Sequence, residues 1–396
     1  MTARPLFWKR LSEPRPVLGV LVMAASLGVA GLFAVLDGGF GARSLSLVAG
    51  LFFGVALQRG ELSLVRAWRD LLQLRDSGQL LGFVTALAVA ATLTLGTLGA
   101  FGLVPPETAR IGPVHWLLPI AGFFFGVASV IARGGVMVHM RRLSEGSLIA
   151  VPALLATFAG FVAGVALWPF TWRFAVDGAP APWLPDFFGL FGTLALELAV
   201  AAAMAAALWR FRPRAGPVLP LARRIFVEPW PAWAAGALLG TLVATSYAAG
   251  EPLGLIAECA TVARRLATAL GLAPTAIPGL DTGVGGIVVP LTALGLTEHV
   301  VILLGFLCGA FSAALSSGRF AIAGFTRREG RDMVVGGLLL GFSAMTALGA
   351  ITGEAIAGVA VGAASGWAFL ASASLGVIVA LRYEPNLTMM APASGG

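Results

Sequence analysis

The stretch FFFGVASVIARGGVMVHMRRLSEG, residues Phe123–Gly146, begins as a membrane helix and then departs from one. Its first ten residues are nearly all apolar, but Arg133, the Gly134-Gly135 pair and the Arg141-Arg142 pair soon follow. Backbone that leaves a helix at membrane depth is tolerated only where protein buries it or where it lines a cavity. The stretch therefore predicts a broken membrane helix that faces the protein interior.

Composition places the chain in a membrane. Its 396 residues are 58% hydrophobic and 11% charged, with a mean hydropathy of +0.91, whereas a soluble domain is about 25% charged. Apolar runs of roughly 20 residues recur, and the alternating segments of about ten residues typical of a membrane β-barrel do not. The net charge of +7 comes from arginines clustered between apolar runs, which is not a nucleic-acid footprint. We expect an all-α polytopic membrane protein whose partner is the lipid bilayer, with no nucleic acid.

About ten apolar segments follow one another along the chain. They lie at residues 17–36, 44–74, 78–103, 114–142, 147–168, 186–209, 229–270, 292–316, 332–360 and 362–382. Four of them contain glycine or proline together with a polar group, at residues 58–61, 132–135, 249–254 and 348–354. A short apolar segment follows each interruption, so the sequence predicts four broken helices that converge on a central pathway.

The arginines orient these crossings. With a cytoplasmic N-terminus, the strongly basic segments fall on the cytoplasmic side, and the opposite side holds only Arg110 and Arg173, as the positive-inside rule requires. The first apolar run lacks a small-residue cleavage site, so we expect it to remain as a helix. The expected domains are a cytoplasmic segment 1–16, transmembrane halves 17–209 and 229–383, a basic cytoplasmic connection 210–228 and a tail 384–396. The predicted location is the cytoplasmic (inner) membrane of a bacterium, with both termini in the cytoplasm.

The order of the crossings contains an internal symmetry. Crossings one to five run plain, broken, plain, broken, plain, and crossings six to ten repeat that order. Because five is odd, the second set starts from the opposite face, which makes an inverted repeat. Secondary transporters commonly have this arrangement, with sites near the midplane at discontinuous helices.

Groups at the breaks could form a path for a solute. The N-terminus of a half-helix presents unpaired N–H groups and positive partial charge, which suit an anion. Arg59 and Arg133 would attract an anion, whereas Glu251 and Glu354 would repel one. Alternatively, the glycines only allow close helix packing and the arginines extend to the interface. The predicted pathway residues are Arg59, Ser63, Arg133, Gly134, Gly135, Gly349, Ala350, Thr352, Gly353 and Glu354.

Other polar residues in the apolar spans predict little chemistry. Glu197 lies in the middle of a span, where an acid is either functional or a hydrogen-bonded link between two helices. His139 has no second metal ligand at helical spacing and is expected to neighbour Arg141 at the interface. Cys259 and Cys308 lack the paired spacing of a disulfide or a thiol metal site. Since no nucleophile–base pair, phosphate loop or paired carboxylates occur, we predict no enzyme, no metal and no cofactor.

Four ordered stretches resemble the YeeE/YedE family of sulfur-compound transporters, which includes bacterial thiosulfate importers. They are FGVALQRGELSLVRAWRDLLQLRD, FGVASVIARGGVMVHMRRLSEGSL, LCGAFSAALSSGRF and GGLLLGFSAMTALGAITGEAIAG, and the resemblance spans residues 45–385. It implies a membrane transporter for a sulfur anion such as thiosulfate, with a sulfur-carrier protein as a candidate partner on the cytoplasmic side.

The chain departs from this family at the residues that carry its chemistry. The family motifs place cysteines at three constrictions, and the matching residues here are Ser63, Gly135 and Ala350. Glu354 stands where the family usually has a neutral amide. Two functions stay open: a permease for a small solute such as a sulfur-containing anion, by a route without thiols, or a transport-inactive relative that serves as a structural membrane subunit of a larger complex.

Overall fold

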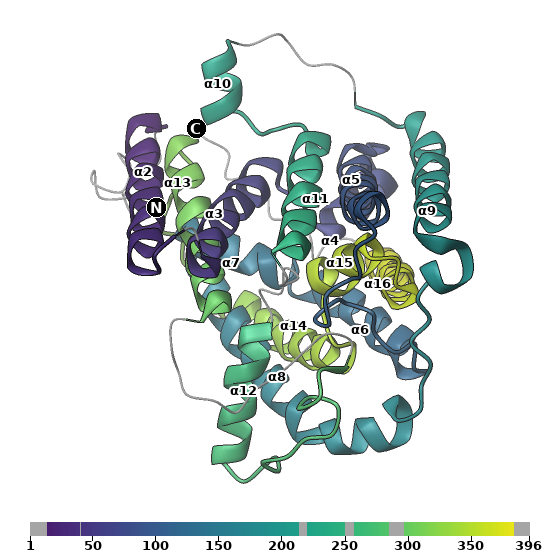
Figure 1. The fold of residues 1–396 in the computed structure, drawn as a ribbon. Helices are drawn as coiled ribbons and strands as arrows, with labels where there is room; N and C mark the ends of the chain where they lie inside the picture. The colour runs from purple at the N-terminus through teal and green to yellow at the C-terminus, as the bar shows by residue number, and fades with distance from the viewer. Residues whose placement is uncertain (1–13, 40, 214–219, 250–256, 285–296, 384–396) are drawn as a thin grey trace.

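The computed structural model describes residues 14–39, 41–213, 220–249, 257–284 and 297–383 (Figure 1). Apart from two isolated β-bridges, this part of the chain holds helices and connections and no strand. Nine helical spans within it are long and apolar enough to cross a membrane, and the shorter apolar helix Ala232–Ala248 corresponds to the remaining expected crossing. The predicted all-α polytopic architecture is confirmed.

The helices follow the expected segments closely. They are α2 (Pro16–Leu36), α3 (Ala42–Gly60), α4 (Leu64–Arg69), η1 (Asp70–Leu74), α5 (Gly78–Phe101), α6 (Leu117–Ile131), α7 (Val136–Ser144), α8 (Ala150–Thr171), η2 (Trp172–Val176), α9 (Pro185–Trp209), α10 (Leu221–Phe226), α11 (Ala232–Ala248), α12 (Ala257–Ala269), α13 (Glu298–Ser316), α14 (Arg327–Thr346), η4 (Ile351–Ile356), α15 (Ala357–Ala360) and α16 (Ala364–Tyr383). The predicted terminal segments lie largely outside the described residues.

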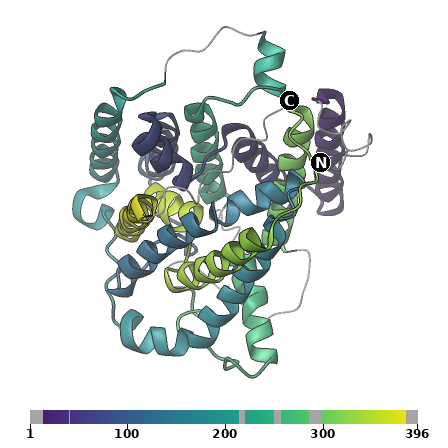
Figure 2. The ribbon, with the colours of Figure 1, turned by 180° about the vertical axis from the view of Figure 1, so that it is seen from behind.

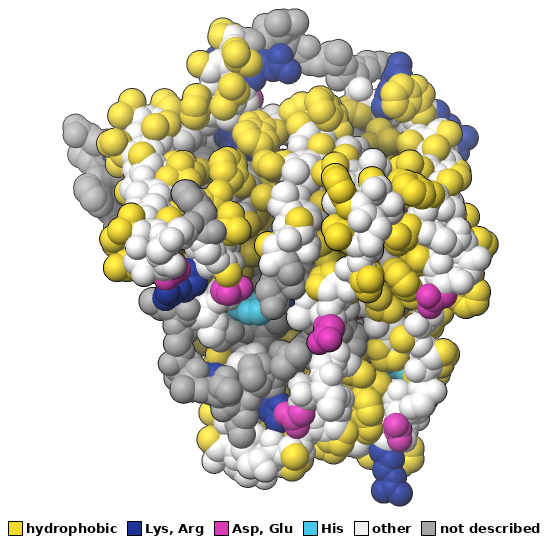
Figure 3. Space-filling model, in the orientation of Figure 1, with side chains coloured by type: hydrophobic (Ala, Val, Ile, Leu, Met, Phe, Trp, Pro, Cys, Tyr) yellow, Lys and Arg dark blue, Asp and Glu magenta, His cyan; other side chains and the backbone are white. Residues whose placement is uncertain are grey.

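One end of the bundle carries most of the arginines. We call it the basic face, and it comprises Arg75, Arg141, Arg142 and the described residues 210–213, 220–224 and 319–331. Of its segments, α10 lies at the top of Figure 1, whereas α12 lies at the lower left. Figure 3 shows hydrophobic side chains covering the sides of the outer helices, with basic side chains above them and a few more at the left and at the bottom. Since lipid tails offer no polar partners, this apolar belt marks the surface that meets the bilayer.

Helix packing repeats itself across the two halves. In the first half α3 packs on α13, and in the second its counterpart α11 packs on α5. The pair α6 and α16 likewise has its counterpart in α14 and α8, and the outer pairs α2–α13 and α9–α5 match too. Seen from behind, α6 and α14 lie side by side at the centre (Figure 2). Each crossing of one half thus has the same packing partners as the crossing five places away in the other half, as the inverted repeat requires.

Glycine sets how closely these pairs approach. A Cβ atom added at Gly126 of α6 or Gly376 of α16 would overlap a backbone carbonyl oxygen of the partner helix. The same holds for Gly160 of α8 and Gly341 of α14, the symmetric pair. Membrane helices associate through such close packing, because the hydrophobic effect does not drive helices together in lipid. Both halves therefore use the same device to build the scaffold that holds the breaks.

Three of the four predicted breaks are present in the described residues. The chain leaves a helix after α3, after α6 and after α14, and a short helix follows each time: α4 with η1, α7, and η4 with α15. The fourth expected break, residues 249–254 with Glu251, lies almost wholly outside the described residues. α4 and α7 lie on the side of the basic face, and η4 belongs to the opposite side, where Leu184 N–H donates to the Gly362 carbonyl at 2.9 Å.

Candidate functional site

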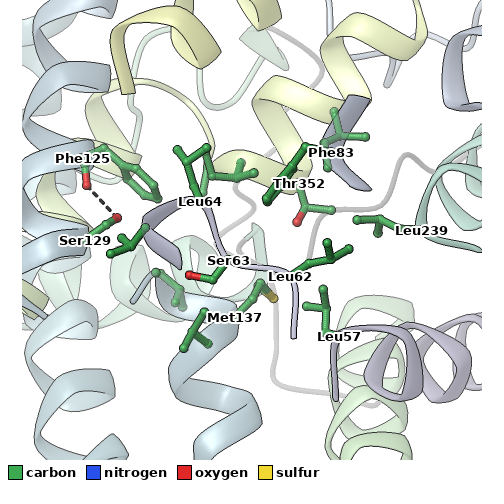
Figure 4. Close-up of a pocket in the computed structure, with 17 residues that line it drawn as sticks. Leu57, Leu62, Ser63, Leu64, Phe83, Phe125, Ser129, Met137, Leu239 and Thr352 are labelled. Carbon is green, nitrogen blue, oxygen red and sulfur yellow. Dashed lines mark hydrogen bonds between the residues drawn. The ribbon is translucent and has the colours of Figure 1, made fainter. Parts of the chain in front are cut away.

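The three breaks meet at one cavity inside the bundle. Its walls include residues 62–65 after α3, 135–138 after α6 and 350–352 after α14. Ser63 lies between Ser129 of α6 and Leu239 of α11 in the close-up of Figure 4. Segments almost 290 residues apart in sequence thus form one site, which the symmetry of the fold brings to the centre.

Each break supplies this cavity with the N-terminus of a helix. Ser63 is the N-cap of α4, Gly135 of α7 and Ala350 of η4, and all three have extended backbone. The Ser63 hydroxyl accepts from the Arg66 N–H at 3.5 Å, but Gly135 and Ala350 offer no side-chain cap. The first N–H groups of a helix have no partner within it, and together with the helix dipole they attract anions. The cavity is therefore suited to a small anion.

The backbone at the three breaks adopts conformations that ordinary residues avoid. Glu61, Arg133 and Leu348 have φ angles of 52°, 56° and 59°, one in each break. Gly134 follows Arg133 with φ of 155°, where a Cβ atom would meet Val138 Cγ1 at 2.6 Å. Left-handed non-glycine residues cost of order 1–3 kcal/mol each and cluster at functional sites. The surrounding helices hold these turns in place so that the short helices start at the cavity.

The rest of the wall is apolar with a few hydroxyls. Leu57, Phe83 and Phe125 line it, and the hydroxyl groups come from Ser63, Ser129 and Thr352. Ser129 Oγ already donates to the Phe125 carbonyl at 2.8 Å, so its proton is not available to an anion, and only Ser63 and Thr352 could donate a hydroxyl proton. Within the described residues no charged side chain belongs to the lining. Attraction for an anion must come from backbone N–H groups and hydroxyls in a surrounding of low polarity.

The two predicted arginines are engaged away from the cavity wall. Arg59 Nη1 donates to the Val227 carbonyl at 3.1 Å, and its Nη2 donates to the Glu228 carbonyl. Arg133 Nη1 contacts Glu329 Oε1 at 3.0 Å. Both side chains thus tie a break to the basic face, and any attraction they exert on an anion in the cavity acts through their field and not through contact.

The remaining predicted residues divide into those that line the cavity and those that do not. Ser63, Gly135, Ala350 and Thr352 line it, whereas Gly134, Gly349, Gly353 and Glu354 do not. The Gly134 carbonyl oxygen accepts from Nε2 of the buried His139 at 3.1 Å, because a carbonyl cannot donate. His139 therefore holds this carbonyl, which would repel an anion. The sequence predicted His139 at the interface and did not predict this hydrogen bond. The spacing of five residues between Gly134 and His139 is the signal that could have indicated it.

A polar network joins the first break to the basic face. Glu61, in the first break, forms ion pairs with Arg66 and Arg319. Gln58 Nε2 donates to Glu145 Oε1 at 2.8 Å, and Arg141 Nη1 contacts the same oxygen at 3.2 Å. These contacts join α3, the end of α7 and the connection after α13, which are distant in sequence. Ion pairs and a hydrogen bond between side chains therefore hold these segments together on this side.

Comparison with known proteins identifies the family. The chain matches the family model described as sulphur transport over residues 59–379, from the end of α3 into α16. The chain belongs to the sulphur transport (YeeE/YedE) family. A thiosulfate transporter, TsuA, from Spirochaeta thermophila is similar to it, with 26% identity over 341 residues that cover 81% of this chain and 92% of the relative. The resemblance inferred from the motifs is confirmed, and the protein is a multi-pass member of a membrane transporter family.

Proposed function

We propose that this family member carries a small sulfur-containing anion, of the thiosulfate type, through the cavity between the three breaks and without thiols. The observation that carries the proposal is the convergence of three helix N-caps, Ser63, Gly135 and Ala350, on one cavity. Backbone N–H groups at helix starts bind anions in many proteins. The relative named as a thiosulfate transporter supports the choice of anion.

Thiols take no part in the proposed route. Cys259 packs against the main hydrophobic core from α12, and Cys308 packs from α13 against the cluster that includes α2. Neither sulfur lines the cavity. The Ser63 hydroxyl and the N–H groups after Gly135 and Ala350 would instead replace the water molecules around the anion, as fixed dipoles do in selective membrane pores.

The polar network at Glu61 and Glu145 would act as the inner gate. With the basic face in the cytoplasm, an anion would enter from the opposite side, occupy the cavity and leave once these ion pairs separate. Exchange between two such closures around a fixed site is the usual behaviour of inverted-repeat transporters. A sulfur-carrier protein that removes the anion would bind at this cytoplasmic face.

The alternative is a transport-inactive membrane subunit of a larger complex. The largely apolar wall and the glycine and alanine at two of the three N-caps favour it, because these residues contribute no polar side-chain atom. Under that alternative the cavity would be a remnant, and the breaks would serve only to hold the fold.

Flux into liposomes separates the two functions. The purified protein would be reconstituted, and uptake of labelled thiosulfate, sulfite and sulfate would be measured against empty liposomes. We expect uptake of at least one of these anions, with competition among them. Absence of flux with all three, together with copurification of other subunits in mild detergent, would favour the structural role.

A further inference from the structure

Glu354 is a buried acid beside the cavity that anion binding through backbone N–H groups does not use. It is 2% exposed and lies in the first turn of η4, whose N-cap and first residues line the cavity. Its own N–H donates to the Ala350 carbonyl at 2.7 Å. An ionisable group within a membrane span is costly and is by default a candidate for function.

The surroundings of Glu354 come from the side of the bundle opposite the basic face. A Cβ atom placed on Gly112 would lie 3.4 Å from Glu354 Oε1 and 3.2 Å from Ser365 Oγ, so the connection before α6 covers both oxygens. Arg110 of the same connection interacts electrostatically with Glu354. The Arg110 N–H donates to the Tyr247 hydroxyl at 3.3 Å, and that hydroxyl donates to the Ala357 carbonyl at 2.7 Å.

Few other groups in this region can titrate. His115 lies on the same connection, and burial lowers its pKa to about 4, so its ring is neutral at physiological pH. The helices α5 and α15 contain no titratable side chain, and the titratable residues of α16, Arg382 and Tyr383, lie at its far end. The nearest other buried acid of this half is Glu197 of α9, which faces Trp367 on α16. Among the described residues two acids lie next to residues that line the cavity: Glu61, which is ion-paired with Arg66 and Arg319, and Glu354, which is buried behind the lining.

An ionised Glu354 would compete with a bound anion. Both negative charges would be attracted by the same positive N-terminal end of η4, because acids in the first turn of a helix interact favourably with its dipole. The two charges would also repel each other across a surrounding of low dielectric constant. Protonation removes the competing charge, and by linkage an anion in the cavity must favour protonation to the same degree.

We propose that Glu354 takes up a proton when the anion enters the cavity and releases it when the anion leaves, which makes transport proton-coupled. The inference rests on the proposed function, since it requires an anion in the cavity. One proton adds to a carboxylate oxygen and later dissociates from it, while the anion forms no covalent bond. Typical couplings between two sites change affinity by about 5–150-fold, and we expect protonation of Glu354 to strengthen anion binding within that range.

Thiosulfate flux at different pH tests this proposal. Thiosulfate keeps its charge across the neutral range, so a pH response reports on the protein. As the external pH falls from about 8 to about 6, we expect uptake by the wild type to rise at least about fivefold. Glu354→Gln keeps the shape of the side chain but cannot titrate, and its uptake should not depend on pH. The matched control, Glu197→Gln, removes the other buried acid of this region and should respond to pH as the wild type does.

A second readout needs no variant. Adding thiosulfate to the purified protein in weakly buffered detergent should consume a fraction of a proton per bound anion, about 0.4–0.85 at most for a coupling of 5–150-fold, which a pH dye would record. A wild-type pH response retained in Glu354→Gln, or thiosulfate binding without proton uptake, would overturn the coupling and leave the transport function standing. Absence of thiosulfate binding and flux at every pH would overturn both.

Discussion

Adjacent glycines at the second break should respond very differently to the same substitution. Gly134 has φ of 155°, and an added Cβ atom would meet Val138 Cγ1 at 2.6 Å and Cβ at 2.8 Å. A backbone angle of this kind costs about 1–3 kcal/mol for a residue with a side chain, and overpacking adds about 1–3 kcal/mol. Gly134→Ala should therefore lower the free energy of unfolding by about 2–6 kcal/mol.

Gly135→Ala is the matched control for that change. Gly135 has φ of −80° and ψ of 179°, and a Cβ atom added there would have no neighbouring atom within 4 Å. Alanine is a poorer N-cap than glycine but reduces the freedom of the unfolded chain by about 0.4–1 kcal/mol, so the effects nearly cancel. Unfolding in mixed micelles, followed by tryptophan fluorescence, would measure both variants. Equal destabilisation, or a larger loss in Gly135→Ala, would refute the geometry of this break.

Three further variants test separate parts of the account. Replacing Cys259 and Cys308 by serine should leave anion uptake unchanged, and a loss of flux with intact folding would contradict the thiol-free route. His139→Phe removes the donor to the Gly134 carbonyl and should cost about 1–3 kcal/mol, because a buried acceptor is left unpaired; an unchanged unfolding curve would exclude that hydrogen bond. Burial holds the pKa of His115 at about 4 against 6.5, so the unfolded chain binds more protons between these values and stability falls as pH drops through this window. His115→Gln should flatten that slope, and an identical pH profile would contradict the burial of the ring.

The location of the breaks was predictable from local sequence. Glycine beside a polar group within an apolar run indicates an interrupted membrane helix. The stretches around Gly135 and Ala350 indicated their breaks correctly. The inverted repeat followed from the order of plain and broken segments. The family motifs also singled out Ser63, which the structure places with Gly135 and Ala350 at one cavity.

The contacts made by charged side chains could not be read from the sequence. Arg59 and Arg133 lie next to breaks in the sequence, where an anion-binding residue is expected. Their contacts are instead with the Glu228 carbonyl and the Glu329 carboxylate, more than 160 residues away in the chain. The apolar wall was equally hidden, since Leu239 carries no signal that separates a cavity residue from a core residue. Such assignments depend on which helix faces meet, and local patterns do not determine that.

Flux through Gly135 variants tests the central claim most directly, namely that an anion passes through the cavity where three helix N-caps meet. A leucine side chain at this position would point into open space and fill the cavity without displacing the backbone, since no neighbouring atom stands within 4 Å of an added Cβ atom. Thiosulfate uptake into liposomes should be as fast for Gly135→Ala as for the wild type and should fall to the level of empty liposomes for Gly135→Leu. Uptake by a folded Gly135→Leu protein at the wild-type rate would show that the anion takes another path.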